Sequence, residues 1–106
     1  MSAQMFLASG HGAIGDGESA ATAVAVEIET GFKPKYVRVV TMDETNPYIS
    51  EWFEGMDAGK GVQLADDTGY EVDEISANGI TVGDRGFTLG TECQEDSRKY
   101  YWMALG

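Results

Sequence analysis

The chain has 106 residues, of which 42% are hydrophobic and 24% are charged, a composition typical of one soluble globular domain and not of a disordered chain. Eighteen acidic residues against seven Lys and Arg give a formal net charge of −11. We therefore expect no nucleic acid and no membrane among the partners, because both need a positive protein surface. The charge suits solubility, or attachment to a positively charged protein surface.

The first part of the chain is rich in glycine and predicts no regular element. We expect an extended N-terminal arm over residues 1–19, followed by a β-domain over residues 20–106. The arm has too few apolar side chains to fold alone, but enough to become ordered on a partner. Its candidate contact residues are Phe6, Leu7 and Ile14.

Strand patterns begin directly after this arm. Residues 20–29 alternate, with Val24, Val26 and Ile28 on one face, which predicts a half-buried strand. A turn at Thr30-Gly31 follows, and the β-branched residues within 36–40 predict the next strand.

The segment 47–56 fits two kinds of element. Ile49, Trp52, Phe53 and Met56 have helical spacing, and a short helix is one reading. Its aromatic content and flanking glycines favour a strand instead. We expect a strand here.

The rest of the chain contains short apolar segments bounded by Gly, Asn or Asp, and Asn78-Gly79 predicts a hairpin turn. The number and spacing of these segments predict an all-β fold, a single β-sandwich or jelly-roll-like domain. The expected core residues are Val24, Val26, Ile28, Val37, Val39, Val72, Ile80, Val82, Phe87 and Leu89.

The last predicted strand, residues 100–105, is apolar on both faces. Tyr100, Trp102 and Ala104 point one way, and the alternate residues point the other. In a chain this small, such a strand lies between two covered faces or is buried on one face and docked on a partner through the other. The candidate interface residues of this strand are Tyr101, Met103 and Leu105.

No motif predicts catalysis, a metal site or a cofactor. His11 is the single histidine and lies in the arm, whereas a catalytic triad needs a rigidly held base. Cys93 stands alone, so the chain has no internal disulfide, and one Cys with one His does not complete a zinc site. No segment approaches the roughly 20 apolar residues of a membrane span. We expect a soluble, non-enzymatic protein made in a cytoplasm.

Four blocks of the sequence, at residues 30–39, 51–56, 79–91 and 100–102, resemble small structural proteins of tailed bacteriophages. The resemblance implies a β-sandwich virion protein that decorates or cements a capsid. It implies the major capsid protein and copies of itself as partners, and a place on the capsid exterior after assembly in the host cytoplasm.

Similar patterns occur in lectin-like jelly rolls of tail fibres and receptor-binding proteins. In that alternative, exposed aromatic rings would form a platform on which sugars stack. The candidates for such a platform are Trp52, Tyr100, Tyr101 and Trp102.

Overall fold

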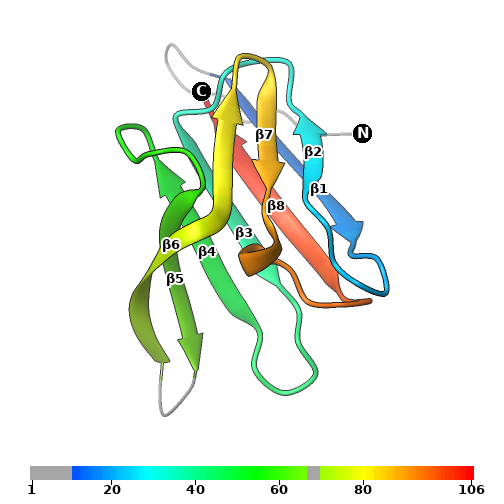
Figure 1. The fold of residues 1–106 in the computed structure, drawn as a ribbon. Coiled ribbons are helices and arrows are strands. Elements are labelled where there is room, and N and C mark those ends of the chain that lie inside the picture. Colours follow the sequence, from blue (N-terminus) through cyan, green and yellow to red (C-terminus); the bar gives the residue numbers. More distant parts are fainter. Residues whose placement is uncertain (1–10, 67–69) are drawn as a thin grey trace.

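The computed structural model describes residues 11–66 and 70–106, and their regular structure is almost wholly β-strand (Figure 1). This confirms the all-β prediction. A short 3-10 helix, η1, spans Thr91–Cys93. The strands are β1 (Gly12–Glu18), β2 (Val26–Glu29), β3 (Tyr36–Thr41), β4 (Tyr48–Phe53), β5 (Lys60–Asp66), β6 (Tyr70–Gly83), β7 (Gly86–Leu89) and β8 (Lys99–Leu105).

The eight strands form one antiparallel sheet in the order β1-β8-β3-β4-β5-β6-β7-β2. The sheet curls into a half-barrel, so that two layers face each other (Figure 1). We call β1, β8, β3, β4, β5 and residues 70–75 of β6 the β8 layer. Residues 80–83 of β6, with β7 and β2, form the β7 layer. A sandwich or jelly roll is not confirmed, because both layers belong to one hydrogen-bonded sheet.

The sheet turns its corner within β6. Lys60 and Gly61 are adjacent on β5, yet they pair with Ile80 and Ile75, so residues 76–79 of β6 bulge out of the ladder. The predicted hairpin turn at Asn78-Gly79 is therefore wrong. Asn78 has a positive φ of 58°, and this backbone conformation lies within the bulge where the sheet turns its corner.

Glycines let three backbone segments meet at this corner. The Gly79 N–H donates to the Gly59 carbonyl at 2.9 Å, and the Gly79 carbonyl accepts from the Gly90 N–H at 2.7 Å. A Cβ on Gly79 would lie 2.6 Å from the Lys60 carbonyl oxygen, and one on Gly90 would lie 2.1 Å from that of Asn78. Side chains at these two positions would therefore separate the strands.

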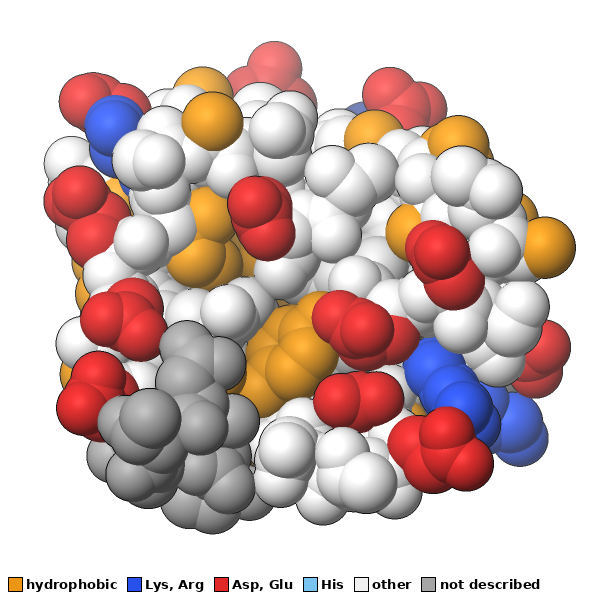
Figure 2. Space-filling model, turned by 60° about the horizontal axis from the view of Figure 1, so that its bottom comes forward, with side chains coloured by type: hydrophobic (Ala, Val, Ile, Leu, Met, Phe, Trp, Pro, Cys, Tyr) orange, Lys and Arg blue, Asp and Glu red, His pale blue; other side chains and the backbone are white. Residues whose placement is uncertain are grey.

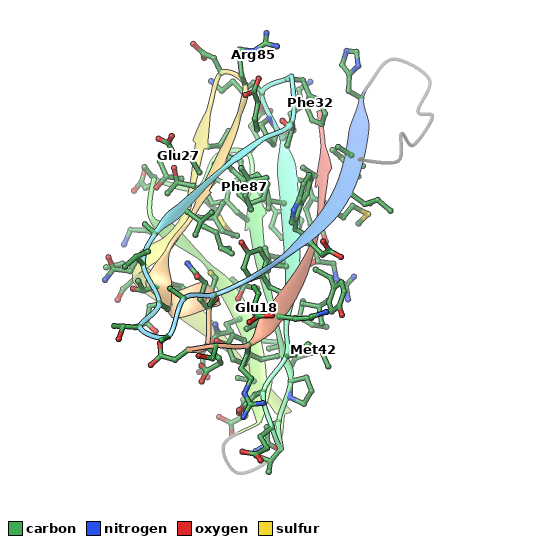
Figure 3. All side chains as sticks on the ribbon, turned by 90° about the vertical axis from the view of Figure 1, so that its right-hand side faces the viewer. Glu18, Glu27, Phe32, Met42, Arg85 and Phe87 are labelled. Atoms are coloured by element: carbon green, nitrogen blue, oxygen red, sulfur yellow. The ribbon has the colours of Figure 1, made fainter. Side chains whose placement is uncertain are left out.

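The core lies between the two layers. Val37 and Val39 of β3 are buried as predicted, and so are Ile80 of β6 and the predicted core residues of β7. Trp102 packs edge-on against Phe87 with ring centroids 5.5 Å apart, which joins the layers through an aromatic pair. Figure 3 shows Phe87 between the layers. The buried predicted residues are Val37, Val39, Ile80, Phe87 and Leu89; Val26, Ile28 and Val82 are partly buried.

Two predicted core residues are exposed. Val24 is 58% exposed because β2 begins only at Val26, so that residues 20–25 stay outside the sheet. Val72 is 71% exposed because its pairing with Leu64 places it on the outward face of the β8 layer. Alternation identified a buried face in each segment, but it did not define where the strand began or which face was inside.

The predicted arm over residues 1–19 is wrong where it can be compared, because Gly12–Glu18 form β1 and pair with β8 without a register shift. Gly15 and Gly17 make room for aromatic rings. A Cβ on Gly15 would lie 2.6 Å from the Trp102 ring, and one on Gly17 would lie 2.4 Å from the Tyr100 hydroxyl. Here glycine serves close packing, not a loop. Phe6 and Leu7 lie outside the described residues.

The prediction of a strand within residues 47–56 is confirmed by β4. Tyr48, Ser50 and Trp52 are buried in alternation, while Phe53 is exposed. This period of two places one face of β4 toward the core and the other toward the outside of the half-barrel.

Buried Gln94 holds the connection between β1 and β2. Its side-chain oxygen accepts from the Ser19 hydroxyl at 2.8 Å, and its Nε2 donates to the carbonyls of Val24 and Leu89 at 2.8 and 3.0 Å. One side chain thus ties the end of β1, the approach to β2 and the end of β7. No buried side-chain nitrogen or oxygen atom in the described residues lacks a partner.

Candidate functional site

The outward face of β8 is apolar. Tyr100, Trp102 and Ala104 are buried, so the alternate residues point away from the core. Tyr101 is 44% exposed, and Met103 and Leu105 are partly buried by their neighbours. The structure thus places all three predicted interface residues of this strand on one outward face.

Neighbouring strands extend this apolar surface. Tyr101 lies opposite Val40, Val40 opposite Ile49, Ile49 opposite Leu64, and Leu64 opposite Val72. Cross-strand partners point to the same side of a sheet, so these five side chains form one row from β8 to β6.

A second apolar row lies closer to the chain's end. Leu105 pairs with Tyr36, and Tyr36 pairs with Phe53, whose ring centroid is 5.1 Å from that of Tyr36. Between the two rows, Met103 pairs with Ile14 of β1. We call the whole set the outer apolar face: Ile14, Tyr36, Val40, Ile49, Phe53, Leu64, Val72, Tyr101, Met103 and Leu105.

Polar groups interrupt this face in the middle. Arg38 lies opposite Met103 on one side and Glu51 on the other. The Tyr36 hydroxyl donates to the Glu51 carboxylate. Burial, and then this hydrogen bond, raise the pKa of Tyr36 to about 12. The Tyr36 hydroxyl therefore remains protonated and donates a hydrogen bond at neutral pH. The outer apolar face thus contains a hydrogen-bonded polar pair among its apolar side chains.

Sequence analysis missed most of this face. It identified Ile14, Tyr101, Met103 and Leu105, but not the outward residues of β3, β4 and β5. The available signal was the one used for β8: the runs in β3 and β4 have apolar residues at adjacent positions, such as Val39 and Val40. A strand that is apolar on both faces buries one face in the core and leaves the other apolar face for another contact.

The outward face of the β7 layer is polar. Thr81 pairs with Thr88, and Thr88 pairs with Glu27, so the row equivalent to that of Tyr101 carries hydroxyls and a carboxylate. Figure 3 shows Glu27 and Arg85 pointing away from the core. Arg85 Nε lies 3.8 Å from the Glu29 carboxylate, an exposed ion pair of little energetic weight.

Most aromatic rings considered for sugar stacking are inside the protein. Trp52, Tyr100 and Trp102 are 6%, 4% and 7% exposed. The Trp52 Nε1 donates to the Asp57 carbonyl at 3.4 Å. Tyr101 alone of the four predicted candidates presents its ring to solvent. The structure does not bring these rings together as an open platform.

The residues with catalytic or metal-binding chemistry are dispersed. His11 stacks on Phe32 with ring centroids 5.5 Å apart, at the start of β1. Cys93 is fully buried, and burial raises the pKa of its thiol to about 11, which makes it a poor nucleophile at neutral pH. Across residues 11–66 and 70–106, no three His, Cys, Asp or Glu side chains are grouped to hold a metal ion.

Acidic side chains surround the end of the molecule formed by the β3–β4 and η1–β8 connections. Figure 2 shows carboxylates spread over this end, with Lys and Arg side chains at few places. Glu44 is exposed there and lies 3.3 Å from Arg98. Together with the formal charge of −11, this makes the end of the molecule electronegative.

Comparison with known proteins gives no relatives: no protein-family model, curated protein sequence or solved structure matches the chain. No helix in the described part of the chain is long and apolar enough to cross a bilayer.

Proposed function

We propose that the chain is a non-enzymatic structural protein that docks on a larger assembly through the outer apolar face. Following the resemblance to tailed-phage proteins, the assembly is a capsid shell, the partner is the major capsid protein, and the chain decorates or cements the virion exterior. The two layers of the curled sheet then provide the core and the outward surfaces that the two sheets of a β-sandwich would provide. The observation that carries the proposal is the uninterrupted apolar row from Tyr101 to Val72 across β8, β3, β4, β5 and β6.

The size of the face suits a contact that is weak for one copy. Five strands spaced about 4.8 Å apart, each contributing roughly 20 Å of length, give a surface of roughly 500 Å² on the outside of the half-barrel, with Arg38 and Glu51 included. Specific stable interfaces bury about 800 Å² on each partner. Single copies would therefore bind weakly, and an array of linked contacts on a repeating shell would supply the strength.

Charge complements the apolar contact. A protein with a net charge of −11 is attracted to a shell surface that carries Lys and Arg around apolar groups. The same charge keeps free copies apart before docking. We therefore expect docking to weaken as salt screens the long-range attraction, while the apolar contact persists.

Two aspartate substitutions on opposite faces test the proposal. Tyr101→Asp places a charge within the outer apolar face, and Thr88→Asp places the same charge on the outward face of the β7 layer. Each variant is mixed with capsid shells that lack the chain, and occupancy is measured after sedimentation. We expect at least about a tenfold loss of affinity for Tyr101→Asp and near-normal binding for Thr88→Asp, because a buried unpaired charge is costly.

The controls are circular dichroism and thermal melting of both variants. Binding of folded Tyr101→Asp equal to that of the parent would rule out this face as the docking surface. The lectin-like alternative is not proposed, because no described feature favours it after the burial of Trp52, Tyr100 and Trp102.

A further inference from the structure

A middle row of side chains, which includes charges, lies between the two apolar rows of the outer apolar face. Its members, each opposite the next from β1 to β6, are Ile14, Met103, Arg38, Glu51, Val62 and Glu74. Arg38 is in the interior of this row. On β3, Tyr36 and Val40 flank Arg38 on the same side of the sheet, and each belongs to one of the apolar rows. Arg38 therefore lies near the centre of the outer apolar face.

Arg38 differs from the arginines that form ion pairs. In the described parts of the chain, the two ion pairs are those of Arg85 with Glu29 and of Arg98 with Glu44, and Arg38 belongs to neither. Glu51 is the cross-strand partner of Arg38, yet the two side chains form no ion pair. The Arg38 side chain is half-buried, so its charge is surrounded by the apolar rows without a direct carboxylate partner.

The Tyr36 hydroxyl interacts with both of these opposite charges. It donates a hydrogen bond to the Glu51 carboxylate. Arg38 interacts with the same hydroxyl and lowers the pKa of Tyr36, against the larger effects of burial and Glu51. A guanidinium has five N–H donors, whereas one hydroxyl oxygen accepts very few of them. Most donors of Arg38 are therefore left for solvent or for a partner.

Docking on a purely apolar surface would remove water from these donors. A charge that is buried without a partner is costly, so a surface that matches the outer apolar face supplies an acceptor opposite Arg38. A carboxylate suits this position best. Its two oxygens accept two parallel N–H bonds from the planar guanidinium, and its charge neutralises that of the arginine.

We propose that the docking partner is a protein surface with an Asp or Glu side chain that pairs with Arg38 at the centre of an apolar patch. This inference rests on the proposed function, because it specifies the chemistry of the surface that the outer apolar face contacts. Arg and Tyr near the centre of an interface commonly dominate its binding energy. Arg38, together with Tyr36, thus determines the specificity of this face.

The margins of the face carry the opposite charge. Exposed Asp16 lies opposite Tyr101 at the β1 side, and exposed Glu74 ends the middle row on β6. A complementary surface therefore has Lys or Arg around its apolar patch and a carboxylate inside the patch. A phosphate also pairs with Arg38, but nucleic acid or an anionic bilayer would bring many more negative charges against Asp16 and Glu74. These margins favour a protein carboxylate.

Arg38→Met tests the pairing with little change of shape, because methionine keeps an unbranched apolar side chain and lacks the guanidinium. Arg85→Met is the matched control. It removes the same charge from the exposed turn between β6 and β7, outside the outer apolar face. Binding of each variant to capsid shells that lack the chain is measured by sedimentation, with Tyr101→Asp measured alongside. Circular dichroism and thermal melting check that each variant is folded.

We expect Arg38→Met to lose at least about tenfold in affinity and Arg85→Met to bind like the parent. A partner patch that is only apolar predicts the opposite sign, because methionine adds apolar contact and removes the cost of burying a charge. Binding of Arg38→Met that equals or exceeds that of the parent therefore overturns the inference.

The inference and the proposed function fail in different ways. If Tyr101→Asp loses binding while Arg38→Met binds as the parent does, docking on the outer apolar face stands and the carboxylate partner is overturned. If Tyr101→Asp binds like the parent, the face is not the docking surface and both proposals are overturned.

Arg38→Lys provides a second test, which identifies the partner's carboxylate. The substitution keeps the positive charge and introduces an amine at the same position. A carbodiimide joins an amine to a touching carboxylate as an amide, and the water that is lost converts the carbodiimide to a urea. Shells saturated with the variant are treated with carbodiimide, and the linked peptides are identified by mass spectrometry. Arg85→Lys is the control.

We expect position 38 to become linked to an Asp or Glu of the shell protein, and position 85 to form no such link. A link from position 38 only to Glu51 of the same chain, in shells that have bound the variant, would overturn the inference. In that case the cross-strand neighbour, and not the partner, neutralises the charge in the docked state.

Discussion

The outward row of the β8 layer contains Tyr101, Val40 and Ile49, whereas the comparable row of the β7 layer contains Thr81, Thr88 and Glu27. Both layers cover the same core and belong to the same sheet. The β7 layer thus shows that a layer of this sheet folds with a polar outward face. The core therefore does not account for the apolar outward face of the β8 layer, whereas the proposed docking on a partner would.

The inward residues, which both layers share, should show the largest effect on stability. Phe87 of β7 packs on Trp102 of β8, and both are buried. Phe87→Ala should lower the free energy of unfolding by about 3 to 5 kcal/mol, the usual cost of deleting a buried ring. Urea unfolding measures this change. A variant as stable as the parent would mean that the two layers do not depend on this contact.

Glycines in the two layers should respond differently to a methyl group. Gly15→Ala places a Cβ 2.6 Å from the Trp102 ring, so Trp102 must move, at an expected cost of about 1 to 3 kcal/mol. Gly83→Ala is the matched control, since the nearest atom lies 4.0 Å away. Thermal melting should show a clear loss for the first and little change for the second. Similar losses would refute the account of why β1 contains glycine.

Alkaline pH should weaken the junction of η1 with the layers. The raised pKa of Cys93, about 11 against 9.0 for a free thiol, means that the unfolded chain ionises first. This contribution to stability is complete below pH 9 and declines as pH rises toward 11. Cys93→Ala should reduce the slope of unfolding free energy against pH in the range 9 to 10. An unchanged slope would show that the thiol is accessible in the folded protein.

Sequence patterns predicted those parts of the fold where local alternation and burial agree. The strand of Val37 and Val39 was identified because β-branched residues fill a pleated surface, and the strand of Trp52 because aromatic residues and flanking glycines favour a strand. For β8 the pattern predicted a strand that is apolar on both faces, and the structure places Trp102 inward and Tyr101 outward.

The failures concern contacts between distant residues. Gly15 and Gly17 predicted a loop, but their role is defined by Trp102 and Tyr100, which are more than eighty residues away in the chain. Asn78 has the local chemistry of a hairpin, yet the paired strands on both sides continue past it and use its positive φ for a corner. The outer apolar face needed the register of five strands, which alternation in one strand does not supply.

Chemical labelling of carboxylates, before and after the chain binds to a capsid shell, tests the docking face most directly. Glu51 lies on the outward side of the β8 layer, and Glu27 lies on that of the β7 layer. We expect docking to reduce labelling of Glu51 strongly and to leave that of Glu27 unchanged. Protection of Glu27 with unchanged labelling of Glu51 would contradict it, because the polar layer would then be the contact surface.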